Sequence, residues 1–380
     1  MEINNTIYNT FWISVYLIVF VFLLTFIILG VASCLRKRKE KETQYNLTFF
    51  QVLLPSDNEI EIKAAEHMFS NLVGFKKGFW KALFTGQYRI SFEIVSKAEG
   101  TAFYVVTPDE IASLVEKQIN AAYPTAQVDI VKPHEIWDRG KHTRIAELKL
   151  RGPAFYPIKQ YEDLKNDSLS PITSAMSKMK VDQVTAVQYI IQPADDNWRL
   201  AGRKFISNAR AVAANPDKKM NIDEKFLEGV ENKISNPGFN IKIRIVSVAD
   251  DRMVADSQMH NMIGAFEQFT DVTYNRFVKR FLFSPKKYIN DFIYRRLRIK
   301  NIAIPMIGIQ VYSNVSVLNN IEMATVFHFP NKDIGTPNIL WLVARKSSAP
   351  IELPEEGIYL GKSVFRGIEK KVHMLDEDRT

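Results

Sequence analysis

Three short stretches of the sequence hold residues whose types and spacing could do chemistry. The first is Gly361–Ser363, a Gly-Lys-Ser triplet that matches the end of a phosphate-binding loop. Such a loop needs a glycine five residues before its second glycine, so that backbone N–H groups can surround the phosphates, and Glu356 holds that position. The residues between them, Ile358–Leu360, favour a strand. The pattern therefore predicts a strand edge and no nucleotide-binding site.

The second group consists of three pairs of neighbouring acidic residues. Paired carboxylates perform acid–base catalysis when their surroundings separate their pKa values. Two of these pairs precede expected helices, however, where carboxylates cap free N–H groups. No Ser/His/Asp or Cys/His arrangement accompanies them, and the six histidines show no metal-binding spacing. We therefore expect no catalytic site, no metal or other cofactor, and no enzyme. The pairs are Asp195-Asp196, Asp250-Asp251 and Glu355-Glu356.

The third group is a basic stretch, Arg276 to Lys300, with nine basic residues and one acidic residue. Ser284 followed by Pro285 is typical of the start of a helix. One face of that helix would be apolar, with the basic residues beside it. Such a surface binds phosphates of nucleic acid or anionic lipid, but an ordinary packed helix with a solvated basic edge has the same pattern. The candidate binding residues are Lys286, Lys287, Arg295, Arg296, Arg298 and Lys300.

All of these stretches follow an uncharged run of 25 residues, Phe11 to Leu35. As a helix the run would measure about 37 Å, enough to cross a hydrocarbon core of about 30 Å. A cleaved signal peptide would need a basic start and a shorter apolar core. Lipidation at Cys34, the lipoprotein alternative, would leave the following basic residues outside, against the positive-inside rule. The run therefore predicts an uncleaved transmembrane helix.

Charge on the two sides of this run predicts its orientation. Residues 1–10 carry only one charged side chain, Glu2, whereas basic residues follow Leu35 at once. Because Lys and Arg are retained on the cytoplasmic side, we expect a single-pass protein of the cell membrane with its N-terminus outside and its bulk in the cytoplasm. The juxtamembrane basic residues are Arg36, Lys37, Arg38, Lys39 and Lys41.

Composition indicates a folded cytoplasmic part. Hydrophobic residues make up 46% of the chain and aromatic residues 12%, which is enough for sizeable cores. The single cysteine, Cys34, lies in the apolar run, which excludes disulfides and cysteine zinc sites downstream. The net charge of +8 comes from two short stretches. The juxtamembrane run contributes +4 and the basic stretch +8, so the rest of the chain sums to −4.

The first half of the cytoplasmic part has the pattern of a ferredoxin-like module. Strand and helix signals alternate in the order βαββαβ, and a Glu99-Gly100 turn joins the two central strands. That order is the split-βαβ arrangement. The expected strands are 48–54, 88–96, 101–106 and 126–131, and the expected helices are 60–75 and 107–122, the second with Thr107 as its N-cap.

The second half repeats part of the first. Phe50–Leu54 aligns with Val187–Ile191 at an offset of 137 residues, although short matches between strands also arise by chance. We expect a second α+β module of the same kind. Its strands are predicted at 183–192, 239–248, 306–313 and 338–344, with a helix at 223–235.

The sequence thus predicts an α+β fold. An N-terminal transmembrane helix is followed by two ferredoxin-like modules and a short C-terminal β-hairpin. The expected divisions are an extracytoplasmic tail (1–10), the transmembrane helix (11–35), a basic linker (36–47), the first module (48–132), a connection (133–182), the second module (183–346), and a linker with the hairpin (347–380).

The C-terminal residues resemble a known family. Tyr359-Leu-Gly-Lys-Ser-Val-Phe-Arg-Gly367, followed by Val372-His-Met-Leu-Asp-Glu-Asp-Arg379, is similar to the segment that leads into the ATPase core of HerA/FtsK-like motors of type IV secretion and conjugation. The membrane helix and the α+β modules are also similar to the N-terminal regions of those motors. The sequence stops at Thr380, where that core would begin, so none of the family's catalytic residues has a counterpart.

The resemblance implies a non-catalytic, membrane-anchored assembly or docking region of a secretion or DNA-transfer system. Its motor domain would be missing or would lie on a separate chain. The alternative is a stand-alone membrane-tethered scaffold that binds nucleic acid or lipid through the basic stretch. The implied partners are the membrane, an ATPase motor chain or other secretion components, DNA, and a second copy of the chain.

Overall fold

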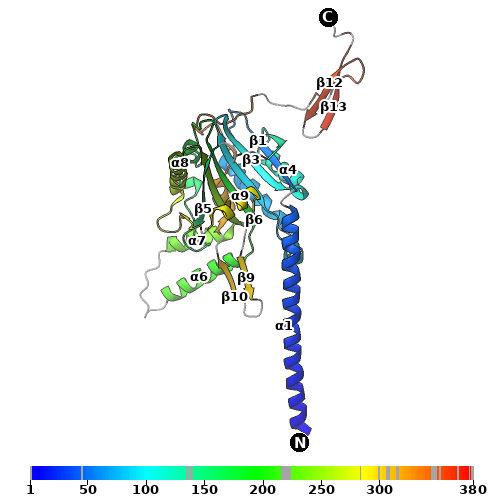
Figure 1. Ribbon diagram of the computed structural model, residues 1–380, viewed down its shortest axis with the longest axis vertical. Helices are drawn as coiled ribbons and strands as arrows, with labels where there is room; N and C mark the ends of the chain where they lie inside the picture. The colour runs from blue at the N-terminus through cyan, green and yellow to red at the C-terminus, as the bar shows by residue number, and fades with distance from the viewer. Residues whose placement is uncertain are drawn as a thin grey trace.

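The computed structural model has one long helix, an α+β body and a separate C-terminal hairpin (Figure 1). Its described residues are 2–43, 46–133, 136, 140–214, 224–282, 284–297, 300–304, 309–313, 316–343, 349–350, 352–365, 368–375 and 377. Within these ranges, the fold class is α+β, as expected.

Helix α1 (Glu2–Thr43) extends away from the body (Figure 1). Its segment Tyr8–Lys39 is long and apolar enough to span a membrane, and its apolar side chains are largely exposed, with Phe26 at 79%. Exposure of that kind suits a helix surrounded by lipid. The basic run that was expected to be a linker is instead helical as far as Thr43.

The first half of the body contains the expected strands and helices. Its four strands lie in the order β4-β1-β3-β2, and each neighbouring pair is antiparallel. One expected detail is wrong: Thr107 caps no helix, because a 3₁₀ turn (Asp109–Ile111) precedes α4 and the Thr107 hydroxyl bonds to none of the described residues. The elements are β1 (Leu47–Leu53), α2 (Ile62–Leu72), α3 (Phe79–Thr85), β2 (Ile90–Lys97), β3 (Gly100–Pro108), α4 (Ala112–Ala122) and β4 (Gln127–Val131).

The second half contributes four more strands in the order β6-β7-β5-β8, and β11 pairs with the start of β7. All of these pairs are antiparallel. The elements are β5 (His142–Leu150), α5 (Ser170–Ala175), β6 (Val184–Pro193), α6 (Asn197–Ala213), α7 (Glu224–Ser235), β7 (Gly238–Ala249), α8 (Arg252–Ala265), β8 (Phe277–Lys279), α9 (Pro285–Ile293), β11 (Ser316–Asn319) and α10 (Asn320–Val326).

The two halves form one continuous nine-stranded sheet, so the expectation of two separate ferredoxin-like modules is not met. The join is the antiparallel pair β2–β6, which runs from Ile90 opposite Ile191 to Ser96 opposite Thr185. In a free-standing first module β2 would be an edge strand, yet all of its residues except Lys97 are buried. Pairing with β6 satisfies the backbone of this apolar strand, which would otherwise invite aggregation.

Other expectations for the second half are also corrected. Segment 133–182 is more than a connection, because β5 lies inside the sheet between β7 and β8. Strand β1 lies between β4 and β3 whereas β6 lies at the join, so the aligned segments of the repeat hold different places in the sheet. In the part of the chain that the structure describes, β10 (Ile309–Ser313) pairs with β9 (Lys300–Ile304) alone, and residues 306–308 are not described. The strand expected at 338–344 is a single bridge between Thr101 and Ile339, and 344 is not described.

The main core lies on one face of the sheet, under α2, α4, α8 and α10. Aromatic rings from distant segments meet there, with the Phe92 and Phe327 centroids 5.0 Å apart and those of Phe69 and Phe92 5.2 Å apart. The other face carries α9 and a smaller apolar cluster that includes Val95, Val246 and Phe292. The expected C-terminal hairpin is present as β12 (Ile358–Phe365) and β13 (Ile368–Met374), away from the body (Figure 1).

Candidate functional site

A row of polar side chains crosses the sheet on the face that carries α9. Glu93 of β2 lies opposite Gln188 of β6, Gln188 lies opposite Arg244 of β7, and Arg244 lies opposite Glu147 of β5. Directly opposed residues project to the same face of a sheet, so these four side chains form one line, which we call the polar row. Each of them is at most 1% exposed.

Hydrogen bonds connect the polar row from end to end. Gln188 Nε2 donates to Glu93 Oε1 at 2.9 Å, and Arg244 Nη1 donates to Gln188 Oε1 at 3.4 Å. Arg244 Nε then donates to Glu147 Oε2 at 3.3 Å. The row therefore links the two halves of the sheet through side chains as well as through the β2–β6 backbone pair.

The polar row also holds the C-terminal end of α9. Gln188 Nε2 donates to the Phe292 carbonyl at 3.0 Å, and Arg244 donates to the carbonyls of Asp291 and Arg296 at 3.0 and 2.6 Å. The last carbonyls of a helix have no partner within the helix, and a cation beside them is favourable. The sheet thus supplies the cap that fixes the basic stretch in place.

Arg295, one of the predicted phosphate-binding residues, is used inside the protein. Its Nε and Nη2 bind both carboxylate oxygens of Glu93, at 2.9 and 3.0 Å, and its side chain is only 11% exposed. Its guanidinium also lies 4.7 Å from the centre of the Phe49 ring. A bidentate pair between arginine and a carboxylate is strong and geometrically specific. Arg295 therefore fastens the basic stretch to the polar row.

The other predicted residues of the basic stretch are not brought together with Arg295. Lys286 and Lys287 are exposed in the first turn of α9. Arg296 lies 4.7 Å above the Tyr294 ring and 3.9 Å from Asp291, with its side chain 24% exposed. Lys300 begins β9, and Arg298 lies outside the described residues.

Three cations surround Glu147 at the far end of the polar row. Lys242 Nζ and Arg280 Nη1 each lie 2.8 Å from Oε1, and Arg244 contacts Oε2. Burial acts to raise the pKa of Glu147, but the charges of Lys242 and Arg244 outweigh it and hold the pKa below its ordinary value. The carboxylate is ionised and fully occupied, which suits a structural role and not proton transfer.

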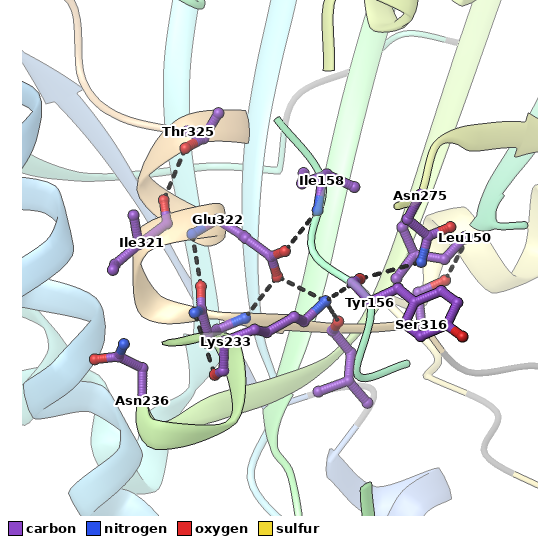
Figure 2. A network of polar contacts seen from close by, with 12 residues as sticks. Leu150, Tyr156, Ile158, Lys233, Asn236, Asn275, Ser316, Ile321, Glu322 and Thr325 are labelled. Atoms are coloured by element: carbon purple, nitrogen blue, oxygen red, sulfur yellow. Dashed lines mark hydrogen bonds and ion pairs between the residues drawn. The ribbon is translucent and has the colours of Figure 1, made fainter. Parts of the chain in front are cut away.

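A second buried ion pair joins α7 to α10 (Figure 2). Lys233 Nζ lies 2.9 Å from Glu322 Oε2, and both side chains are 0% exposed. Lys233 also donates to the carbonyls of Tyr156 and Val317, each at 3.0 Å. All three ammonium hydrogens therefore have acceptors. Burial lowers the pKa of Lys233, and the charge of Glu322 acts against that shift. The nitrogen is enclosed by these three acceptors.

Glu322 completes this network from α10 (Figure 2). It forms a capping box with Asn319, whose Oδ1 accepts from the Glu322 N–H at 2.9 Å while Glu322 accepts from the Asn319 N–H at 3.1 Å. Its Oε1 accepts from the Ile158 N–H at 2.9 Å. The pair with Lys233 consequently ties α7, the 156–158 loop and the start of α10 together.

A third buried pair, His328 and Asp167, borders an open cavity of about 660 Å³ whose lining includes Asp167. His328 Nε2 lies 3.0 Å from Asp167 Oδ2, and Nδ1 lies 3.0 Å from the Ala324 carbonyl. Both ring nitrogens of His328 therefore have partners within the protein. Burial acts to raise the pKa of Asp167, but the charge and hydrogen bond of His328 hold it below its ordinary value.

The juxtamembrane basic residues divide into two groups. Arg36 and Lys39 contact the body, through the Leu83 carbonyl and the Glu110 carboxylate at 2.9 and 3.3 Å. Lys37 and Arg38 are exposed on α1, and the Lys41 side chain lies outside the description. α1 therefore joins the body along a defined contact.

The polar row was not predicted from the sequence. A signal was present in β7, where Lys242 and Arg244 alternate with isoleucines. In a strand that must be covered on both sides, such charges require buried partners. Which partners they find depends on the order of the strands, which the sequence pattern did not reveal.

Comparison with known proteins gives one family match. A family described as a domain of unknown function (DUF8128) matches residues 36–342, and none of the curated proteins matches the chain. Among solved structures, aclacinomycin oxidoreductase is 10% identical with a TM-score of 0.32, covering 59% of this chain and 41% of its own. A heme-binding protein from Thermus thermophilus is 10% identical with a TM-score of 0.16, covering 65% and 94%. The chain thus spans less than half of the oxidoreductase, and neither likeness is close enough to assign a fold or an activity.

Proposed function

The chain belongs to the DUF8128 family, a domain of unknown function, through residues 36–342, and we propose that it acts as a membrane-anchored, non-catalytic docking platform. In this proposal α1 spans the cell membrane once, with its N-terminus outside and the body in the cytoplasm. The length and apolar character of Tyr8–Lys39 support the span. The basic residues that directly follow the apolar run support the orientation.

The feature that carries the proposal is the way the body uses its buried charges. Glu93, Glu147 and Glu322 are each saturated by cations and N–H donors of the chain itself. Catalytic groups are held near a cavity with pKa values matched to proton transfer, whereas these carboxylates are buried and covered by partners from the chain itself. Such networks rigidify a body, and rigidity is what a platform for other proteins needs.

We infer further that the body consists of two βαββαβ units joined edge to edge. The first has the order β4-β1-β3-β2, and the second has the matching order β8-β5-β7-β6. Helices α5 and α8 lie in the crossover positions of the second unit, and α6 and α7 are inserted between β6 and β7. Strands β2 and β6 hold equivalent places, so their pairing removes an exposed edge from each unit and produces one broad sheet.

The proposed partner is an ATPase motor of a type IV secretion or conjugation system. The resemblance of Tyr359–Gly367 to the segment that precedes such motors supports this choice. The β12–β13 hairpin contains most of that segment. Among the described residues its two strands pair only with each other, and the hairpin lies away from the main sheet (Figure 1). A second candidate, binding of nucleic acid or lipid, is favoured by the exposure of Lys286 and Lys287.

Binding to a purified motor tests the proposal. The full chain in lipid nanodiscs would be titrated with the HerA/FtsK-type ATPase from the same genome, next to a variant that lacks 357–374. The control variant is Lys286→Ala with Lys287→Ala, which leaves the hairpin intact. We expect binding by the full chain and the control, and at least about tenfold weaker binding without the hairpin, about 1.4 kcal/mol. No binding by the full chain, or equal binding without the hairpin, would contradict the proposed partner.

A further inference from the structure

A short helix that was not expected from the sequence, α3 (Phe79–Thr85), contacts α1. Arg36 donates from Nε and Nη2 to the Leu83 carbonyl, at 3.3 and 2.9 Å. Leu83 is in the last turn of α3, where carbonyls lack partners within the helix and a cation is favourable. Because Arg36 is the first residue after the uncharged run, this contact places α3 at the level where the apolar part of α1 ends.

The burial of Ala32 shows that the contact continues into the apolar run. Ala32 is 1% exposed, whereas Val31 and Leu35 are 50% and 44% exposed. It lies four residues before Arg36, or about 6 Å along the axis. When the apolar run occupies the hydrocarbon of a bilayer, the region of α3 therefore lies at the depth of the lipid headgroups.

Hydrogen bonds at the base of α3 hold the helix in place. The Gln87 side chain accepts from the Lys77 N–H at 2.7 Å and donates to the Lys77 carbonyl at 2.8 Å, which closes the segment into a loop. Lys77 Nζ donates to Thr85 Oγ1 at 3.2 Å, and Lys76 Nζ donates to the Ala194 carbonyl at 2.9 Å. Gly86, at a φ of 71°, ends the helix. α3 is thus a fixed projection of the body and not a mobile loop.

The exposed side chains of α3 suit a membrane surface. Trp80 is 68% exposed although it is large and apolar, and its neighbour Lys81 is also exposed. Tryptophan concentrates at the boundary between headgroups and acyl chains, where one end of its ring is apolar and the other is wet. Lys37 and Arg38 lie exposed at the adjacent end of α1. Basic residues in that position attract anionic lipid headgroups.

We propose that α3 binds the anionic lipid surface beside α1, with Trp80 at the level of the headgroups. This inference rests on the membrane anchor of the proposed function, but not on the motor partner. It gives the body a second attachment to the bilayer. A body held by α1 alone could swivel about the helix axis, whereas attachment at α3 as well fixes which side of the sheet faces the membrane.

Quenching of a fluorescent label by brominated lipid tests the proposal on the full chain in vesicles. The native Cys34 reports on the anchor, since it lies in the apolar run. In a Cys34→Ser background, Lys81→Cys reports on α3 and leaves Trp80 in place. The matched control is Val272→Cys, because Val272 is 97% exposed and lies in the loop before β8. Vesicles with about 30% anionic lipid would be compared with neutral vesicles.

We expect strong quenching at position 34, and quenching at position 81 that is at least about threefold stronger than at 272. Trp80→Ser should reduce the quenching at 81 by about half or more, and neutral vesicles should reduce it too. Quenching at 34 with equal values at 81 and 272 would overturn the role of α3 and leave the anchor standing. No quenching at 34 would overturn the anchor itself. Quenching at 81 that is insensitive to Trp80→Ser would overturn the assignment to Trp80. Binding of a protein to α3 in place of lipid would also overturn that assignment.

Discussion

Arg295 binds Glu93 across 202 residues of sequence, with Nε 2.9 Å from Oε1 and Nη2 3.0 Å from Oε2. The pair connects the segment after α9 to β2, in the first half of the sheet. Because Gln188 also donates to Glu93, the same carboxylate holds the second half of the sheet as well. Three parts of the chain that are distant in sequence thus meet at one buried acid.

Breaking this pair should be costly. Arg295→Ala leaves the Glu93 carboxylate buried without its cation, and removal of one partner from a buried ion pair typically lowers the free energy of unfolding by about 3–5 kcal/mol. Chemical unfolding of the full chain in detergent, followed by circular dichroism, would measure the loss. Lys286→Ala, at an exposed site on α9, should leave stability unchanged. A loss as small in Arg295→Ala as in Lys286→Ala would contradict the fastening role.

The Lys233–Glu322 pair should behave as a coupled unit. Lys233→Met and Glu322→Gln each leave one buried group without its partner, so each should cost about 3–5 kcal/mol. The double variant should lose less than the sum of the two, because the second change removes the group that the first left unpaired. Unfolding free energies of the four proteins give the coupling. Strict additivity would show that the two side chains stabilise the fold independently.

Stability should depend on pH through Glu147. The pKa of Glu147 in the folded protein lies below the ordinary value of a glutamate. The carboxylate therefore contributes its full stabilisation of the fold at pH values above that ordinary pKa, and the contribution is lost as the pH falls through the folded pKa. The free energy of unfolding of the unchanged protein should therefore fall as the pH is lowered from about 5 through the folded pKa of Glu147. Glu147→Gln should be less stable at pH 7 and should show a shallower fall. Parallel pH profiles for both proteins would contradict this assignment.

Nucleic-acid binding by the basic stretch stays a prediction, and the structure sharpens its test. Lys286 and Lys287 are the exposed members, whereas changes at Arg295 would perturb folding. If the full chain binds DNA, Lys286→Ala with Lys287→Ala should flatten the log–log salt dependence by up to about 1.8, or about 0.9 for each lost phosphate contact. Titrations of labelled DNA at several salt concentrations would measure the slope. An unchanged slope would remove these two lysines from the site.

Local chemistry made much of the fold predictable. The expected strands and helices of the first half are present in the order of the sequence pattern, Glu99-Gly100 marks the turn between β2 and β3, and Ser284 before Pro285 correctly predicted where α9 begins. The long apolar helix α1 was predictable from the length and lack of charge of residues 11–35 alone. These features depend on residues that are close in sequence.

Features that depend on distant residues were not predictable in the same way. The join of Ile90 to Ile191 depends on two apolar strands meeting edge to edge, and either strand alone fits an isolated module. The polar row exists only once four strands lie in that order. The sequence placed Arg295 among the binding candidates because its partner, Glu93, lies 202 residues away in the first half of the chain. α3 was not predicted, because the seven residues between Gly78 and Gly86 are too few to show helical periodicity.

The central claim, a body held in the cytoplasm by one span, is tested most directly by the accessibility of two engineered cysteines in intact cells. In a Cys34→Ser background, Asn5→Cys and Ser235→Cys would be exposed separately to a membrane-impermeant maleimide. Ser235 is exposed at the end of α7, so its labelling is limited by the membrane and not by burial. We expect labelling at position 5 in intact cells, and at position 235 only after the cells are opened. Labelling at position 235 in intact cells would contradict the orientation and the cytoplasmic platform with it.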